Sequence, residues 1–157
     1  TAVHQGDNLA ARSDMLLGAM LAGQAFANAP VGAVHALAYP LGGTYHIPHG
    51  LSNSLMLPHV IRFNAPAAGE LYLQIAEPIA GIDSSELDGS TVSEVLAGYF
   101  YELAARLGLP TRLREMQIAE SALPDLAEKA LDQQRLLINN PREVEYDDAL
   151  EIYRQAF

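Results

Sequence analysis

The chain has 157 residues, of which 50% are apolar, and its nine basic and nineteen acidic side chains give a net charge of −10. That length suits one folded domain, and the acidic balance excludes the basic surfaces with which proteins bind nucleic acids and anionic membranes. No cysteine, signal peptide or apolar run of about 18 residues is present, which excludes a disulfide framework and favours a cytoplasmic protein that does not span a membrane.

The chain opens with a predicted long helix. Asp7 is the expected N-cap, and leucines and methionines recur at helical-turn spacing until about Ala29. The second half of this helix is rich in alanine and glycine, which lets neighbouring helices approach closely. Pro30 then predicts a break before a second helix, which carries His35.

His35 and His49 are candidate metal ligands on either side of a predicted turn. They are 14 positions apart, so one continuous helix would separate them by roughly 21 Å, whereas two ligands of one ion each lie about 2.0–2.1 Å from it. Pro40, Gly42-Gly43 and Pro48 lie between them and predict a reversal of the chain. A helix, a turn and a second helix would bring the imidazoles to one site. The alternative is that each is a hydrogen-bonded core histidine.

The rest of the chain also shows helical periodicity, without strand-like alternation. The pattern predicts five further helices: His49 to Asn64 with a kink at Pro58, residues 67–79, residues 91–107 with a capping box of Thr91 and Glu94, residues 122–137, and a last helix that Asp147 or Asp148 caps and that ends near Phe157. An apolar stripe over 91–107, which includes Val92, Val95, Leu96 and Leu107, is expected to be core, and residues 81–90 are expected to form a loop. We therefore expect an all-α bundle of about six or seven helices over residues 1–157.

Residues 32–64 resemble the second signature of the iron-containing (group III) alcohol dehydrogenases. In that family a helix of small residues carries a metal-binding histidine, and a glycine-rich turn and a Pro-His-Gly with a second such histidine follow. The matching positions here are His35, residues 41–43 and residues 48–50. The similarity runs from about Leu9 to the closing segments NNPREV and DDALEIYRQAF. It implies the all-helical, metal-binding C-terminal domain of this family, a dehydroquinate synthase-like fold.

The resemblance also implies cofactors. Family members hold a divalent iron with one aspartate and three histidines, and by position His35 and His49 would be the last two of these ligands. Neutral imidazoles also suit zinc, so Fe2+ and Zn2+ both stay open. The metal would polarise the substrate oxygen, and hydride would pass to or from NAD or NADP. The other two ligands and an N-terminal nucleotide-binding domain would precede Thr1, so we expect a chain truncated by design or proteolysis, and no cofactor-binding residue is assigned.

Two further positions match functional positions of the family. Tyr39 stands where many members have a histidine that relays protons, and at i+4 from His35 it shares the same helix face. A phenol with a pKa near 10 is a poorer proton shuttle than imidazole, so Tyr39 is a candidate for catalytic proton relay or for packing alone. Phe26 matches a position that lines the substrate cleft, and the alternative is an ordinary core phenylalanine. His46 is a candidate for a contact near the cleft, and His59 is expected to be a core histidine.

The resemblance implies the C-terminal part of a metal-dependent NAD(P) alcohol dehydrogenase that interconverts alcohols and aldehydes or ketones. Its expected partners are a small alcohol or carbonyl substrate, its own N-terminal domain and, in the full-length protein, a second copy in a homodimer. The 157-residue chain alone is expected to be inactive. Two alternatives stay open: a helical structural domain with no independent activity, and a maleylacetate reductase or glycerol dehydrogenase-like member of the same superfamily.

Overall fold

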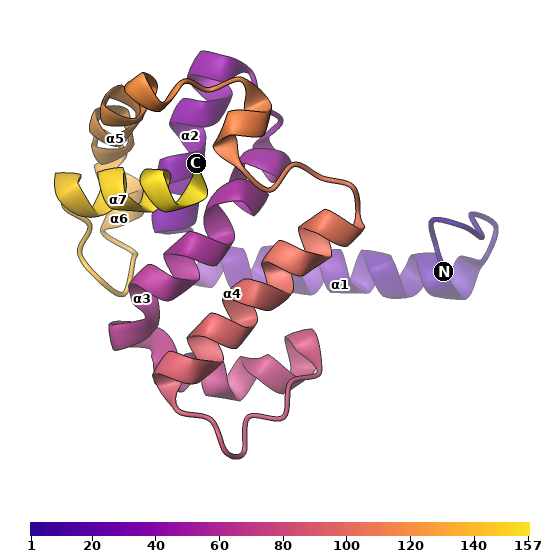
Figure 1. The fold of residues 1–157 in the computed structure, drawn as a ribbon. Helices are drawn as coiled ribbons and strands as arrows, with labels where there is room; N and C mark the ends of the chain where they lie inside the picture. Colours follow the sequence, from indigo (N-terminus) through magenta and orange to yellow (C-terminus); the bar gives the residue numbers. More distant parts are fainter. The chain divides into compact units, whose positions relative to one another are not determined.

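The computed structural model describes residues 1–157 and is all-helical, as the sequence predicts (Figure 1). Its seven α-helices are α1 Leu9–Asn28, α2 Ala33–Tyr45, α3 His49–Ala80, α4 Gly89–Arg106, α5 Leu123–Leu131, α6 Gln134–Leu137 and α7 Tyr146–Ala156, with two 3₁₀ helices at Leu113–Met116 and Glu120–Ala122. The chain divides into two compact units, Thr1–Val31 and Gly32–Phe157. The helices of the second unit carry His35 and His49.

The first unit consists mainly of α1. Asn8 caps this helix, because its side chain accepts a hydrogen bond from the Ala11 N–H at 3.1 Å. The predicted cap, Asp7, is therefore wrong by one residue, as expected where two adjacent residues have equal capping propensity. None of the residues of α1 is buried. Its apolar side chains, such as Leu16 at 73% exposure, contact solvent in this chain.

The connection between α2 and α3 places the reversal later than predicted. Helix α2 continues through Pro40 and the two following glycines to Tyr45. His46 then adopts a left-handed conformation with φ of 56°, and its N–H donates to the Gly42 carbonyl. Pro48 precedes α3, which begins at His49. The turn is therefore made by residues 46–48, and His49 lies in the first turn of its helix.

Helix α3 is one helix of 32 residues rather than the two predicted helices. It passes through Pro58, Pro66 and Pro78 and changes direction along its length in Figure 1. A proline inside a helix removes one hydrogen bond, and packing of the flanking turns compensates for that loss here. The compensating contacts are with α4, in a core cluster of Ile61, Ala76, Val92, Leu96 and Ala97.

The N-cap of α4 lies three residues before the predicted one, Thr91. Asp88 is the N-cap and accepts a hydrogen bond from the Thr91 N–H at 2.7 Å. Glu94 does not cap the helix; its carboxylate instead forms a 2.8 Å salt bridge with Arg62 of α3. The box is therefore wrong, because an aspartate three residues before Thr91 is an equally good cap.

The apolar stripe of α4 is only partly core. Val92 and Leu96 are buried, as predicted, and they pack in the α3–α4 cluster. Val95 and Leu107, however, are 39% and 67% exposed. The apolar residues therefore extend around α4 beyond the side of the helix that packs against α3.

Helices α5 and α6 pack against α2, and α7, which packs on α5 and α3, is linked to α2 by a hydrogen bond. The predicted helix over 122–137 is two helices, α5 and α6, and α7 is capped by Glu145 in a reciprocal capping box with Asp148. The buried hydroxyl of Tyr153 in α7 donates to the Leu37 carbonyl of α2 at 2.6 Å. Asn140 accepts from the Ala33 N–H at 3.3 Å, at the first residue of the helix that carries His35.

Candidate metal site

His35 and His49 lie together, as the sequence predicts. Their ring centroids are 5.1 Å apart and their planes are inclined at 55°. His35 is the third residue of α2 and His49 the first of α3, so the turn at 46–48 returns the chain to the beginning of α2. Two residues 14 positions apart in the sequence thus form one side-chain cluster.

The spacing and charge state of this pair suit metal binding. Two imidazoles that each hold one ion at about 2.0–2.1 Å have ring centres roughly 5–6 Å apart, and the observed separation falls in that range. Burial, and next the proximity of His49, lowers the pKa of His35 below its ordinary value. His35 is therefore neutral at pH 7, which is the form of imidazole that binds metals.

Asn53 fixes the orientation of His49. Its Nδ2 lies 3.1 Å from His49 Nε2 and also donates to the His49 carbonyl at 3.0 Å. Because an amide nitrogen only donates, Nε2 is the acceptor in this contact. The buried Oδ1 of Asn53 has no hydrogen-bond partner in the structure. An orphaned acceptor next to two imidazoles fits a site that a further polar group completes.

Tyr39 joins the same cluster. Its ring centroid is 6.0 Å from that of His49, with the planes at 55°. The phenol therefore lies beside the His49 imidazole. This contact is compatible with proton relay and with packing, so the role of Tyr39 stays a prediction.

The other candidates lie elsewhere. Phe26 is on α1, in the first unit, and is 57% exposed, so its predicted role in substrate binding stays a prediction. His46 is exposed and caps the end of α2. His59 is buried as expected, and its burial, followed by the charges of Arg62 and Arg112, lowers its pKa to about 4.

The histidine pair is not part of a larger group of metal ligands within this chain. No cluster of three or more histidine, aspartate or glutamate side chains suited to a metal ion is present. A catalytic metal site in a protein normally has at least three protein ligands. His35 and His49 by themselves therefore provide fewer protein ligands than such a site uses.

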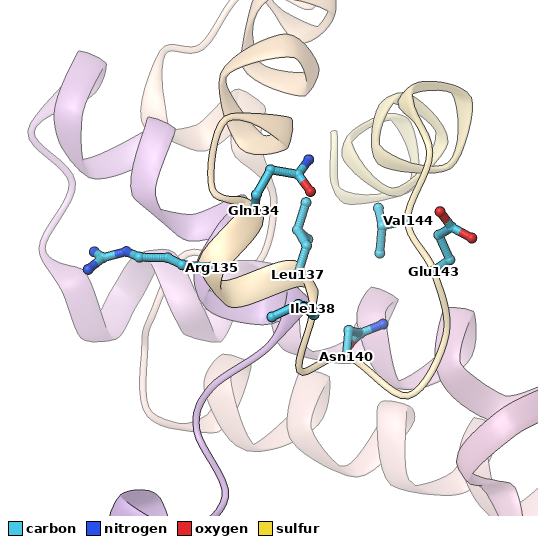
Figure 2. Close-up of a pocket in the computed structure, with 7 residues that line it drawn as sticks. All are labelled: Gln134, Arg135, Leu137, Ile138, Asn140, Glu143 and Val144. Atoms are coloured by element: carbon cyan, nitrogen blue, oxygen red, sulfur yellow. The ribbon is translucent and has the colours of Figure 1, made fainter.

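A hollow in the second unit lies away from these rings. It is bounded by α6 and by the loop before α7, and Figure 2 shows Leu137 and Val144 on its opposite sides. Neither His35, Tyr39 nor His49 lines it. The cluster of His35, Tyr39 and His49 and this pocket are thus separate features.

Comparison with known proteins identifies similar chains. A family profile described as "Fe-containing alcohol dehydrogenase family, C-terminal" matches residues 1–157. The 1,3-propanediol dehydrogenase of Citrobacter freundii is 40% identical over 156 residues, which cover 99% of this chain and 40% of that protein. The lactaldehyde reductase of Escherichia coli (strain K12) is 37% identical over 151 residues, which cover 94% and 38%. The solved alcohol dehydrogenase from Oenococcus oeni matches with a TM-score of 0.89 and 33% identity, over 99% of this chain and 40% of that one.

The chain therefore spans about two fifths of the length of these relatives. Its fold is that of the C-terminal domain in the matched structures, as predicted. No single helix is both long and apolar enough to cross a membrane; α1 and α2 reach that length and composition only when taken together as a bent pair.

Proposed function

We infer the function of this chain from its family: it belongs to the Fe-containing alcohol dehydrogenases. We propose that it is the C-terminal, metal-binding part of a longer oxidoreductase that interconverts small alcohols and the corresponding aldehydes or ketones. The observation that supports this most directly is the 5.1 Å separation of the His35 and His49 rings. We propose that a homodimer is the form of the full-length protein.

The proposed roles of this chain's residues follow from the cluster. His35 and His49 donate ring-nitrogen lone pairs to a divalent metal, iron or zinc, whose chemistry when bound is to polarise the substrate oxygen. Asn53 lies 3.1 Å from His49 Nε2 in the metal-free chain, and a metal bound at Nε2 would displace this contact, because that nitrogen has a single lone pair. Tyr39 borders the reacting groups and either moves a proton or excludes water. NAD or NADP, the hydride carrier, is held by the part of the protein outside these residues.

The test uses the full-length protein that contains this sequence. His35→Ala and His49→Ala should each lower bound iron or zinc, measured by elemental analysis, and lower turnover of 1,3-propanediol or lactaldehyde by at least about 100-fold, because each removes one ligand of a small set. His4→Ala removes an exposed histidine of the first unit and serves as the control, with metal content and turnover unchanged. Unchanged metal content in both site variants would show that these histidines are not ligands.

Two alternative functions are distinguished by the same kind of assay. A helical domain with no activity would leave the full-length protein without turnover for any alcohol, with either nucleotide. A maleylacetate reductase-like or glycerol dehydrogenase-like member would turn over maleylacetate or glycerol in preference to these substrates. Absence of turnover would reject the proposed activity. Preferred turnover of maleylacetate or glycerol would replace the proposed substrate class and leave the proposed metal site in place.

A further inference from the structure

We propose that α1 is an interior helix of the complete protein, enclosed on several sides by the portion of that protein outside these 157 residues. The inference rests on the proposed function in one respect: that proposal makes this chain part of a longer polypeptide. The inference goes further, because it identifies α1 as the surface of this chain that contacts the rest of that polypeptide.

The composition of α1 is that of a buried helix, although none of its residues is buried here. Residues 15–28 contain no charged side chain. The large apolar side chains of the helix are well exposed, and they are Leu9, Met15, Leu16, Leu17, Met20, Leu21 and Phe26, at 50% to 77%. An exposed apolar surface of this kind on one element marks an interaction site.

The apolar side chains surround the helix. Successive residues are rotated by roughly 100°, so Met15, Leu16 and Leu17 alone point to three different sides. A helix at the surface of a protein keeps one polar face, whereas a helix that is apolar all round is an interior helix. A flat partner surface would cover only one side of α1. The occupant must therefore pack around it.

Two glycines of α1 support close packing on more than one side. A Cβ added at Gly18 or Gly23 would meet nothing within 4 Å, and the two positions are roughly 140° apart around the helix. Glycine inside a helix is unfavourable relative to alanine unless something uses the space. Elsewhere in this chain glycine is used in that way, because a Cβ at Gly69 would lie 2.6 Å from the Gly89 carbonyl oxygen. Gly98 of α4 is open in the same way, so the space alone identifies no neighbour; in a helix that is apolar all round it allows a neighbouring backbone to approach closely.

The length of the relatives identifies the occupant. This chain covers 40% of the 1,3-propanediol dehydrogenase, so the larger part of such a protein lies outside it and is long enough to enclose a 20-residue helix. A second copy of this chain would offer one more α1, and a pair of helices leaves the outer sides of both exposed.

Hydrogen exchange of the backbone amides tests the inference. In the full-length protein, amides of residues 9–28 should exchange at least about 100-fold more slowly than in the isolated 157-residue chain, because burial suppresses local opening. Equal exchange rates would overturn the proposal. Protection of the isolated chain that rises with its concentration would identify a second copy as the occupant, and protection that requires phosphatidylcholine vesicles would identify a membrane. Either result would also overturn it.

Glycine variants give a second readout with a matched control. Gly18→Leu and Gly23→Leu should speed exchange of α1 in the full-length protein but not in the isolated chain. Gly98 of α4 is also a helical glycine with nothing within 4 Å of an added Cβ, and Gly98→Leu should act equally in both forms. If the leucine variants of the full-length protein do not fold, Gly18→Ala and Gly23→Ala replace them. Slower exchange of α1 in the alanine variants of the full-length protein would contradict close packing.

Metal content and turnover measured on the same preparations separate the two proposals. A full-length protein that is inactive and metal-free but protects α1 rejects the proposed function and keeps this inference. An active, metal-containing protein in which the amides of α1 exchange freely supports the proposed function and rejects this inference.

Discussion

Tyr39 is the residue through which the chemistry of the ring cluster can be tested. Its ring lies 6.0 Å from that of His49, and Tyr39→His would replace the phenol with an imidazole, the side chain that ordinarily titrates near neutral pH. In the full-length protein, Tyr39→His should therefore add an inflection near neutral pH to the pH profile of kcat. Tyr39→Phe is the control that keeps the ring and removes the hydroxyl. An unchanged profile in Tyr39→His would assign Tyr39 to packing.

His59 makes the stability of the fold dependent on pH. Burial, with Arg62 and Arg112 nearby, lowers its pKa to about 4 in the folded state, and the ordinary pKa of histidine is 6.5. Between these values the unfolded chain binds a proton that the folded chain does not bind. The free energy of unfolding therefore falls as the pH drops through this window, by about 2 kcal/mol between pH 7 and pH 5.

Urea unfolding at pH 7 and pH 5 checks this expectation. The His59→Leu variant should lose less stability between the two pH values than the unchanged chain, by about that amount. His35, whose pKa is also lowered, contributes to both proteins, so the difference between them isolates His59. The exposed-site variant His4→Ala should show the full loss. An equal loss in His59→Leu and the unchanged chain would contradict the prediction.

At the residue scale, the sequence predicted a side-chain contact correctly where a motif specified the two residues that meet. His35 and His49 were predicted to approach each other, and their rings are 5.1 Å apart. The contact of Asn53 with His49 was missed, although the i+4 spacing signals it once α3 is known to begin at His49. The predictions of N-cap residues were wrong. Several neighbouring residues can cap a helix, and only the backbone geometry selects one of them.

At the scale of elements, the crossing of α3 and α4 depends on two glycines. A Cβ at Gly69 would lie 2.6 Å from the Gly89 carbonyl oxygen, and a Cβ at Gly89 would lie 2.9 Å from the Gly69 carbonyl carbon. Both are backbone atoms, so the helices must separate to admit a methyl group. Gly69→Ala and Gly89→Ala should each lower the free energy of unfolding by about 1–3 kcal/mol in urea titrations.

Gly98 provides the matched control for the crossing. It lies in the same helix, α4, but nothing is within 4 Å of an added Cβ. Gly98→Ala should therefore raise the free energy of unfolding by up to about 1 kcal/mol, because alanine has the higher helix propensity. A stabilising effect of Gly69→Ala would show that the two helices are not held in contact at this point.

The existence of helices was predictable, and their continuity was not. Pro40 and Pro58 indicate breaks or kinks in a sequence, yet α2 and α3 pass through both. Tertiary contacts decide this outcome, because packing against α4 and the last three helices offsets the lost hydrogen bonds. The same contacts are not visible in hydropathy patterns. For that reason residues 122–137 read as one helix but form α5 and α6.

At the scale of the whole molecule, the candidate groups are divided between two units. His35, Tyr39 and His49 lie in Gly32–Phe157, whereas Phe26 lies in Thr1–Val31. A family motif specifies local spacing, and the rings of the first group are close together, while their roles stay predictions. The motif gives no information about how α1 packs. None of the residues of α1 is buried in this chain. The role of Phe26 in substrate binding therefore stays a prediction.

The isolated 157-residue chain should accordingly neither oxidise alcohols nor reduce aldehydes. Hydride transfer depends on holding the nicotinamide and the substrate in a near-attack arrangement, and most of the rate advantage comes from that positioning. Dinucleotide-binding folds place a glycine-rich turn between a strand and a helix, whereas Gly42 and Gly43 lie inside α2 of an all-helical chain. His35 and His49 alone also provide fewer protein ligands than a catalytic metal site normally uses.

The assay combines ethanol, butanol and 1,2-propanediol with NAD or NADP, in the presence of added ferrous or zinc ions. We expect no turnover above background, together with weak metal binding that His35→Ala or His49→Ala abolishes in a calorimetric titration. His4→Ala should bind metal as the unchanged chain does. Metal-dependent turnover by the pure chain would contradict the assignment of nucleotide binding to the rest of the protein. Tight binding that survives both histidine substitutions would show that other side chains are the ligands, because a metal cannot stay bound at a site that has lost both imidazoles.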